Sequence, residues 1–266
     1  MRTQLLGIGI LAPGLSDWDT AAEVLRGERS YAAGPIQTPP PAILTPNERR
    51  RSTLATRLAL EAARQATTQS GLPESSLRSV FASSDGDMGL IDSMCQAIYQ
   101  HGSAPSPTVF QNSVNNAVAG YWSIAASCLQ ASNSVTAGDG SFAAGLLEAV
   151  TQVNAEGVPV LLVAFDVQAP PLLHPHRPLG CAFACALVLG PDHFSPDHPR
   201  LILALRKGGG PCSETPIGDD ALEAIRNGNP AARSLSLLSA VANAEPGPVH
   251  LHYWPDLQLE VSLESA

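Results

Sequence analysis

The sequence has little positive charge, no long hydrophobic run and few cysteines. Its 266 residues contain 15 Lys and Arg against 24 Asp and Glu, which gives a net charge of −9. This balance argues against a general nucleic-acid binder, because phosphate contacts require positive charge. No apolar run is long enough to span a bilayer, and Pro13 follows the apolar residues 5–12 where a signal peptide would need its cleavage site. We therefore predict no membrane span.

The cysteines and histidines form no convincing metal site. An odd number of widely spaced cysteines favours reduced thiols and a cytoplasmic location; these are Cys95, Cys128, Cys181, Cys185 and Cys212. The histidine pairs at positions 174/176 and 250/252 lack acidic or cysteine ligands at a suitable spacing, so we interpret them as loop or surface residues. Gly7 and Gly9 loosely match a dinucleotide fingerprint but lie inside an apolar run, which favours a buried strand. We predict neither a metal nor a cofactor.

Alternating short apolar runs and longer helical patterns predict an α/β fold. Hydrophobic residues make up 44% of the chain, enough for a sizeable core. Strands are expected at residues 4–11, 80–83, 134–137, 158–166 and 181–189, and helices at 16–27, 45–70, 88–99, 115–129 and 141–154, with Ser16 and Thr45 as N-caps. This order predicts a parallel or mixed sheet with helices on both faces. After residue 190 we expect a strand at 201–205, helices at 219–226 and 231–242, and a hairpin at 249–253 and 257–263.

Two regions follow from this pattern: residues 1–190, and a short C-terminal α/β segment, 191–266, that covers the core. The helix at 141–154 is apolar around nearly its whole circumference, so it must be buried on all sides. Either the C-terminal segment or a partner chain has to supply the second layer over it.

The turn before this helix is the most informative motif. An apolar strand meets the helix through Gly138-Asp139-Gly140-Ser141. Acyl-transfer enzymes place a nucleophile in such a turn, at the positive end of a helix. Gly138 has no side chain with which to attack. Ser141 is expected as the helix N-cap, and the alternative is that it acts as a nucleophile.

Three arginines, Arg50, Arg57 and Arg64, recur every seven residues of the predicted helix 45–70. They are expected on one stripe, roughly opposite the buried face formed by Leu54, Leu58 and neighbouring alanines. The stripe is either a solvated helix face or a docking strip for an acidic partner.

In order and spacing, four segments resemble the N-terminal half of a β-ketoacyl synthase of the thiolase superfamily: residues 6–10, 80–86, 113–120 and 136–149. The resemblance covers residues 4–190 and is greatest to short ketosynthase-like proteins related to the chain-length factors of aryl-polyene and type II polyketide pathways. It implies a thiolase-like layered fold whose second half is truncated.

The resemblance also implies how this chain departs from an active enzyme. Active ketosynthases carry a nucleophilic cysteine at the position of Gly138, and two histidines in a C-terminal half for which this sequence has no matching motif. We therefore expect no catalytic residue and a chain-length-factor-like subunit that pairs with an active β-ketoacyl synthase and shapes its acyl tunnel. The alternatives are an acyltransferase using Ser141 and a self-associating structural remnant.

Partner contacts are likewise implied by the family. Its members dimerise through the strand before the nucleophile turn and the segment ahead of it, which here gives Asn133, Val135, Ala137, Asn115, Asn116 and Gly120. Phe110 and Gln111 stand where a side chain of one subunit could close the tunnel of the other, although Phe110 could instead be buried in its own subunit. Because carrier proteins of the family are generally acidic, the stripe of Arg50, Arg57 and Arg64 is the expected docking site for an acyl carrier protein.

Overall fold

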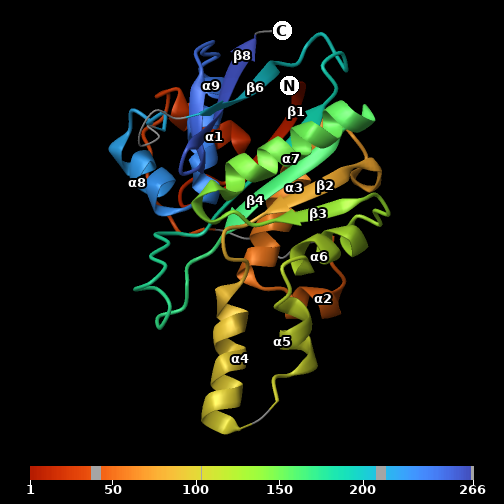
Figure 1. Ribbon diagram of the computed structural model, residues 1–266, viewed down its shortest axis with the longest axis vertical. Coiled ribbons are helices and arrows are strands. Elements are labelled where there is room, and N and C mark those ends of the chain that lie inside the picture. Colours follow the sequence, from red (N-terminus) through yellow and green to blue (C-terminus); the bar gives the residue numbers. More distant parts are fainter. Residues whose placement is uncertain (37–42, 103, 208–213, 265–266) are drawn as a thin grey trace.

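A computed structural model describes residues 1–36, 43–102, 104–207 and 214–264 (Figure 1). Within these ranges, one mixed sheet has the strand order β3-β2-β4-β5-β1-β6-β8-β7. Strands β2, β3 and β4 run parallel to one another, and all other neighbours are antiparallel. The strands are β1 (Arg2–Leu11), β2 (Arg78–Ala82), β3 (Ser132–Val135), β4 (Val160–Asp166), β5 (Phe183–Gly190), β6 (Arg200–Lys207), β7 (Val249–Trp254) and β8 (Leu257–Glu264).

Helices cover both faces of this sheet, as predicted. Helix α3 packs on β1, β4 and β5 from one side with α6 beside it, whereas α7 lies on β2 and β4 from the other side. The two faces bury separate hydrophobic clusters. The helices are α1 (Trp18–Leu25), α2 (Pro46–Arg51), α3 (Leu54–Ser70), α4 (Met88–His101), α5 (Pro107–Asn112), α6 (Ala117–Ala125), α7 (Ser141–Glu156), α8 (Asp220–Gly228) and α9 (Leu235–Ala242), with short 3-10 turns at Glu74–Ser76, Gly138–Gly140 and Ala231–Ser234.

Strand β1 confirms that the Gly7/Gly9 motif is part of a buried strand. A Cβ atom on Gly7 would lie 2.2 Å from the Ala66 carbonyl oxygen of α3, and one on Gly9 would lie 2.0 Å from that of Ala62. Both contacts are far too short, so only glycine lets α3 lie this close to the strand. The glycines therefore serve helix–sheet packing.

The C-terminal segment supplies the cover over α7. Phe142, Leu146 and Val150 of α7 are almost fully buried, and they share a cluster with residues of α9, β7 and β8. Strand β7 reaches the start of this helix, where a Cβ on Gly140 would lie 2.2 Å from the Tyr253 carbonyl oxygen. Because β6 pairs with β1, the C-terminal strands continue the same sheet. The domain division at residue 190 stays a prediction.

The single helix expected at 45–70 is wrong. The capping box at Thr45 and Glu48 is present, but it opens the six-residue α2 only. At Ser52 the backbone is extended, and Thr53 then caps α3 by accepting from the Thr56 amide. A second N-cap residue inside an apparently continuous helical pattern is what the prediction missed. Leu54, expected on the buried face, is 42% exposed at the start of α3.

Two further boundaries differ from expectation. Asp17, and not Ser16, caps α1 by accepting from the Thr20 amide at 2.8 Å. The helix expected at 115–129 is shorter, because α6 spans Ala117–Ala125, and α5 precedes it with Ser106 as N-cap and Pro107 as first residue. Pro105 and Pro107, with one residue between them, favour a loop in that segment, so the sequence pattern did not predict this second helix.

Candidate functional site

The turn between β3 and α7 presents no nucleophile. Gly138 is exposed and has a φ of +54°, the left-handed region that favours glycine. A Cβ atom on Gly138 would meet nothing within 4 Å, so the space in front of the turn is open. The position at which active ketosynthases carry a cysteine is therefore accessible here but has no reactive side chain.

Ser141 braces this turn from inside. It is the first residue of α7 rather than its N-cap, so the capping prediction is wrong. The residue is 1% exposed, and its hydroxyl donates to the Gly138 carbonyl at 2.7 Å and accepts from the Ala137 amide at 3.0 Å. A hydroxyl held in this way is not presented to a substrate, which weighs against the nucleophile alternative.

A chain of ion pairs flanks the turn, and no sequence motif announces it. Arg177 bridges Asp85, after β2, and Asp139, in the turn, at 2.6 Å each. Arg233 of the C-terminal segment contacts Asp139 at 3.4 Å and pairs with Glu214. Burial lowers the pKa of Arg177, but its hydrogen bonds to the two aspartates outweigh this and raise it. These pairs tie the empty turn to the loop 167–182 and to the C-terminal segment.

Asp166, at the end of β4, is the most perturbed acid near this turn. It is buried and accepts hydrogen bonds from Ser83 and Ser84 through Oδ1 and from the Ala231 amide at 3.1 Å through Oδ2. Burial raises its pKa to about 6, against the lowering effect of the serine hydrogen bonds. The carboxyl therefore clamps the ends of β2 and β4 to the C-terminal segment. In the sequence, the signal that could have pointed to Asp166 is an acidic residue at the end of a strongly apolar strand.

His252 is the histidine whose pKa responds to the turn. It lies on β7, and burial, followed by the charge of Arg233, lowers its pKa, whereas the charge of Asp139 in the turn raises it. Among the described residues no group of His, Cys, Asp and Glu could hold a metal ion. Cys212 lies outside the described residues.

The six residues expected at a dimer interface lie along one side of the molecule. Strand β3 ends the sheet, and no described strand pairs with its outer edge (Figure 1). Asn133 is exposed there, and Val135 and Ala137 are half-buried. The Thr136 hydroxyl donates to Asn115 Oδ1 at 3.3 Å, which joins the end of β3 to residues 115–120. In these residues Asn115, Asn116 and Gly120 are exposed as well.

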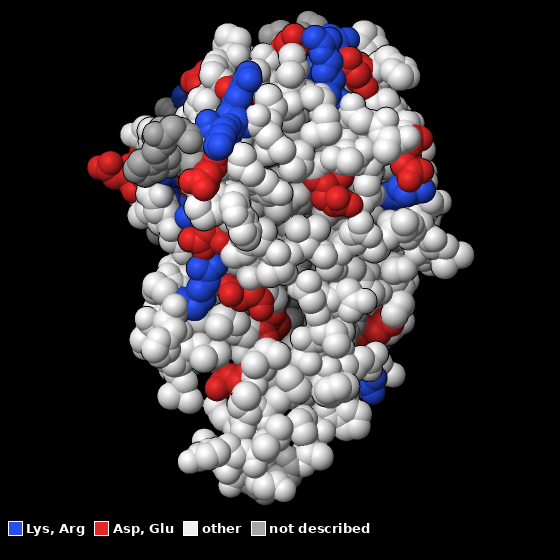
Figure 2. All heavy atoms as spheres, in the orientation of Figure 1, with Lys and Arg blue, Asp and Glu red and all other residues white. Residues whose placement is uncertain are grey.

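Exposed apolar side chains surround these six residues. Ile124 of α6 is 64% exposed, Leu129 is 98% exposed and Val114 is 49% exposed. Figure 2 shows that the surface over β3, α4, α5 and α6 carries few charged groups. Exposed apolar clusters of this kind mark association surfaces. Helical periodicity alone did not reveal them, since it does not show which side of a short helix lacks a neighbour.

Phe110 lies on α5 and is 64% exposed, so the alternative in which it is buried within its own subunit is wrong. Gln111 beside it is exposed too and lines a groove of about 330 Å³ between α2, α5 and α6. Asn116 and Gly120 line the same groove, which places the expected gate next to the expected interface.

The three arginines do not form one stripe, because they lie on two helices. Arg50 lies in the last turn of α2 and Arg57 in the first turn of α3, and both line a hollow of about 320 Å³ with Arg49. Arg64 lies elsewhere and is paired with Glu61 at 2.5 Å. By contrast, no described carboxylate lies within 4.0 Å of Arg49, Arg50, Arg51 or Arg57, which leaves an uncompensated basic cluster.

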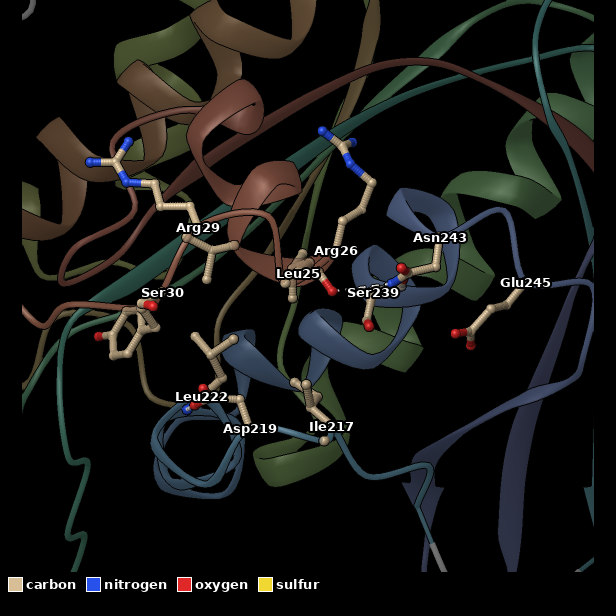
Figure 3. A pocket seen from close by; sticks show the side chains of 14 residues that line it. Leu25, Arg26, Arg29, Ser30, Ile217, Asp219, Leu222, Ser239, Asn243 and Glu245 are labelled. Carbon is tan, nitrogen blue, oxygen red and sulfur yellow. Dashed lines mark hydrogen bonds between the residues drawn. The ribbon is translucent and has the colours of Figure 1, made fainter.

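A cavity of about 600 Å³ lies away from the turn, between the end of α1 and the helices α8 and α9 (Figure 3). Arg26 and Arg29 line it, but their guanidinium groups point away from its centre. Arg26 is paired with Glu28, and Asn243 donates to the Leu25 carbonyl across one wall. Nothing here gathers groups for catalysis.

The layered fold and the glycine-bearing turn define a thiolase-like α/β protein. A family model described as "Beta-ketoacyl synthase, N-terminal domain" matches residues 25–218, and the chain belongs to this family. A comparison with curated proteins gives no match. None of the described helices is long and apolar enough to cross a membrane.

Solved structures show the same fold over the whole chain. A chain of "Ketosynthase (ApeO) in Complex with its Chain Length Factor (ApeC) from Xenorhabdus doucetiae" is 22% identical with a TM-score of 0.75, covering 98% of this chain and 99% of that one. A chain of AntDE:AntF, a type II PKS acyl-carrier protein in complex with its ketosynthase, is 12% identical with a TM-score of 0.75, covering 100% of this chain and 99% of that one. A chain of the ishigamide ketosynthase/chain length factor is 12% identical with a TM-score of 0.74, covering 100% of this chain and 99% of that one.

Proposed function

We propose that this chain is a non-catalytic, chain-length-factor-like subunit that pairs with an active β-ketoacyl synthase in polyketide- or fatty-acid-type biosynthesis. The observation that carries the proposal is Gly138: an intact, open nucleophile turn without a nucleophile. Covalent acyl transfer needs an attacking side chain and a base. The turn offers no nucleophile, and the sequence has no match to the two histidine motifs of active ketosynthases. The aryl-polyene pathway is the finer proposal, and it rests on the resemblance seen in the sequence.

The partner is proposed to bind the outer edge of β3. An unpaired strand edge offers a row of free backbone donors and acceptors. Asn133, Val135 and Ala137 would pair antiparallel with the equivalent strand of the ketosynthase, and Asn115, Asn116 and Gly120 would pack beside them. The exposed apolar residues around this edge support the proposal.

Two further roles belong to the same proposal. Phe110 and Gln111 would close the partner's acyl tunnel by excluded volume, which their exposure and the groove that Gln111 shares with Asn116 and Gly120 support. Arg50, Arg57 and Arg64 would dock an acyl carrier protein. Because Arg64 is already paired with Glu61, Arg50 and Arg57 would supply the larger share of the electrostatic attraction to the carrier protein.

The open β3 edge would equally serve a second copy of this chain, so self-association is the competing function. Coexpression with a ketosynthase from the same genome, followed by size-exclusion chromatography with light scattering, separates the two. We expect a one-to-one heterodimer that Val135→Asp abolishes, because the substitution brings a charge into the strand interface. Leu205→Asp, on the exposed part of β6, is the matched control and should leave it intact. A homodimer that ignores the ketosynthase would overturn the proposal.

A further inference from the structure

Two aspartates at the carboxyl ends of β2 and β4 share one serine hydroxyl. Ser84 Oγ lies 2.6 Å from Asp85 Oδ2 and 2.8 Å from Asp166 Oδ1. A serine hydroxyl has a single hydrogen, so it can donate to one of these oxygens and can only accept from the other. Both contacts are therefore full hydrogen bonds only when one of the two carboxyl groups carries a proton. This geometry thus requires one proton more than a pair of ionised aspartates would hold.

The surroundings of the two carboxyl groups assign this proton to Asp166. The Arg177 guanidinium donates to Asp85 Oδ2 at 2.6 Å and compensates the negative charge of that carboxylate. Asp166 is 1% exposed, and no described Lys, Arg or His forms an ion pair with it. Burial raises its pKa to about 6, against the lowering effect of the serine hydrogen bonds. Asp166 therefore holds the proton on the acidic side of that value.

Few other charges face the Asp166 carboxyl. The titratable groups on the elements around it are Asp85 after β2, Cys185 on β5, Arg233 in the 3-10 turn Ala231–Ser234, and Glu148 and Glu156 on α7. Burial raises the pKa of the Cys185 thiol to about 12, which keeps it neutral. Arg233 and the two glutamates are engaged with other partners. Asp85 is therefore the charge that Asp166 meets when it ionises.

The charge state of this pair matters because Asp85 also anchors the loop 167–182. Arg177 of that loop bridges Asp85 to Asp139, in the turn between β3 and α7. Within the described part of the chain, all ion pairs of this loop are made by Arg177. The loop extends away from the sheet, with Leu172 69% exposed (Figure 1). A displacement of Asp85 is therefore passed to the loop and, through Asp139, to the turn.

We infer that Asp85, Ser84 and Asp166 form a proton-operated latch on the loop 167–182. With the proton on Asp166, Ser84 accepts from Asp166 and donates to Asp85, which holds Arg177 in place. When the proton leaves to solvent, Ser84 can donate to only one of two carboxylates, and the two like charges repel each other across it. The contact between Ser84 and Asp85 then opens, and the loop loosens. All groups of the latch belong to this chain, so the inference is independent of the proposed function.

Carbon-13 NMR of the aspartate carboxyl groups tests the shared proton directly. As the pH of the isolated chain is raised, the Asp166 resonance should shift with a midpoint near 6, and the Asp85 resonance should show a step at the same midpoint. Ser84→Ala removes the linking hydroxyl and should reduce the Asp85 step at least about twofold. The resonance of Asp19, an exposed residue of α1, is the reference for direct effects of pH. A missing Asp85 step, or one that Ser84→Ala leaves unchanged, would overturn the inference.

Hydrogen exchange followed by mass spectrometry tests the effect on the loop. After correction for the intrinsic pH dependence of exchange, amides of residues 167–182 should be at least about tenfold better protected at about pH 5 than at about pH 7.5. Asp166→Asn removes the ionisable group and should abolish this difference, whereas Asp19→Asn, the control, should retain it. Equal protection of the wild-type loop at the two pH values would overturn the inference. If Asp166→Asn fails to fold, Ser84→Ala replaces it and should reduce the difference at least about threefold; an undiminished difference would contradict the latch.

Discussion

Replacing Asp166 with asparagine should remove a pH-dependent part of the stability of this fold. The carboxyl is buried at the junction of β2, β4 and the C-terminal segment, and burial raises its pKa from 3.8 to about 6. The folded protein therefore holds a proton on Asp166 at pH values where the unfolded chain has released it. Its contribution to stability is full below about pH 4 and is lost as the pH rises through about 6, a difference of roughly 3 kcal/mol.

Urea unfolding at a series of pH values between 3.5 and 7.5 measures this effect. The difference in unfolding free energy between wild type and Asp166→Asn should change by about 2–3 kcal/mol across the window, with wild type relatively more stable at the acidic end. Asp19→Asn, which removes a carboxyl from an exposed site on α1, is the control for the loss of one charge. A difference between wild type and Asp166→Asn that is constant with pH would refute the reasoning. An altered far-ultraviolet circular dichroism spectrum would mark a variant that misfolds, and Asp166→Ser then replaces it.

Three further predictions concern the proposed interface and turn. Gly138→Cys should give no condensing activity in a malonyl-dependent elongation assay, because the two catalytic histidines of active ketosynthases have no counterpart in this sequence. Elongation by the purified variant would contradict the non-catalytic assignment. Phe110→Ala should leave the heterodimer intact and lengthen its product, measured by mass spectrometry, whereas an unchanged product distribution would exclude the gate. The double variant Arg50→Ala, Arg57→Ala should weaken carrier-protein association by about 0.5–1 kcal/mol at low salt and reduce the salt dependence of that association. Arg64→Ala is the control and should have a smaller effect. Equal effects of the two variants would show that the basic cluster does not dock the carrier protein.

Much of the fold was predictable because its signals are local. Strands β1, β4 and β5 contain continuous apolar runs bounded by polar or glycine-containing turns. The all-round apolar pattern of α7 required a second layer, which the C-terminal segment provides. The break between α2 and α3 was not predictable from periodicity. It depends on Thr53 acting as a second cap, and α3 also carries threonines within the helix, at Thr56, Thr67 and Thr68, so the residue type alone did not mark the break.

The candidate site was predictable only in part. Gly138 could be placed from the strand–turn–helix pattern, but the pairing of Arg177 with Asp85 and Asp139 joins three loops far apart in sequence. No spacing rule connects such residues, since the tertiary fold alone brings them together. The exposure of Phe110 was undecided for the same reason: α5 is short, and only the arrangement of α4 and α6 shows that no neighbour covers it.

The central claim is that this chain is one half of a heterodimer with an active ketosynthase. Native mass spectrometry of the chain coexpressed with a ketosynthase from the same genome tests it most directly. The account predicts a one-to-one complex for the wild type and separate subunits for Val135→Asp, while Leu205→Asp retains the complex. A wild-type chain that stays monomeric, or binds only itself, in the presence of that ketosynthase would contradict it.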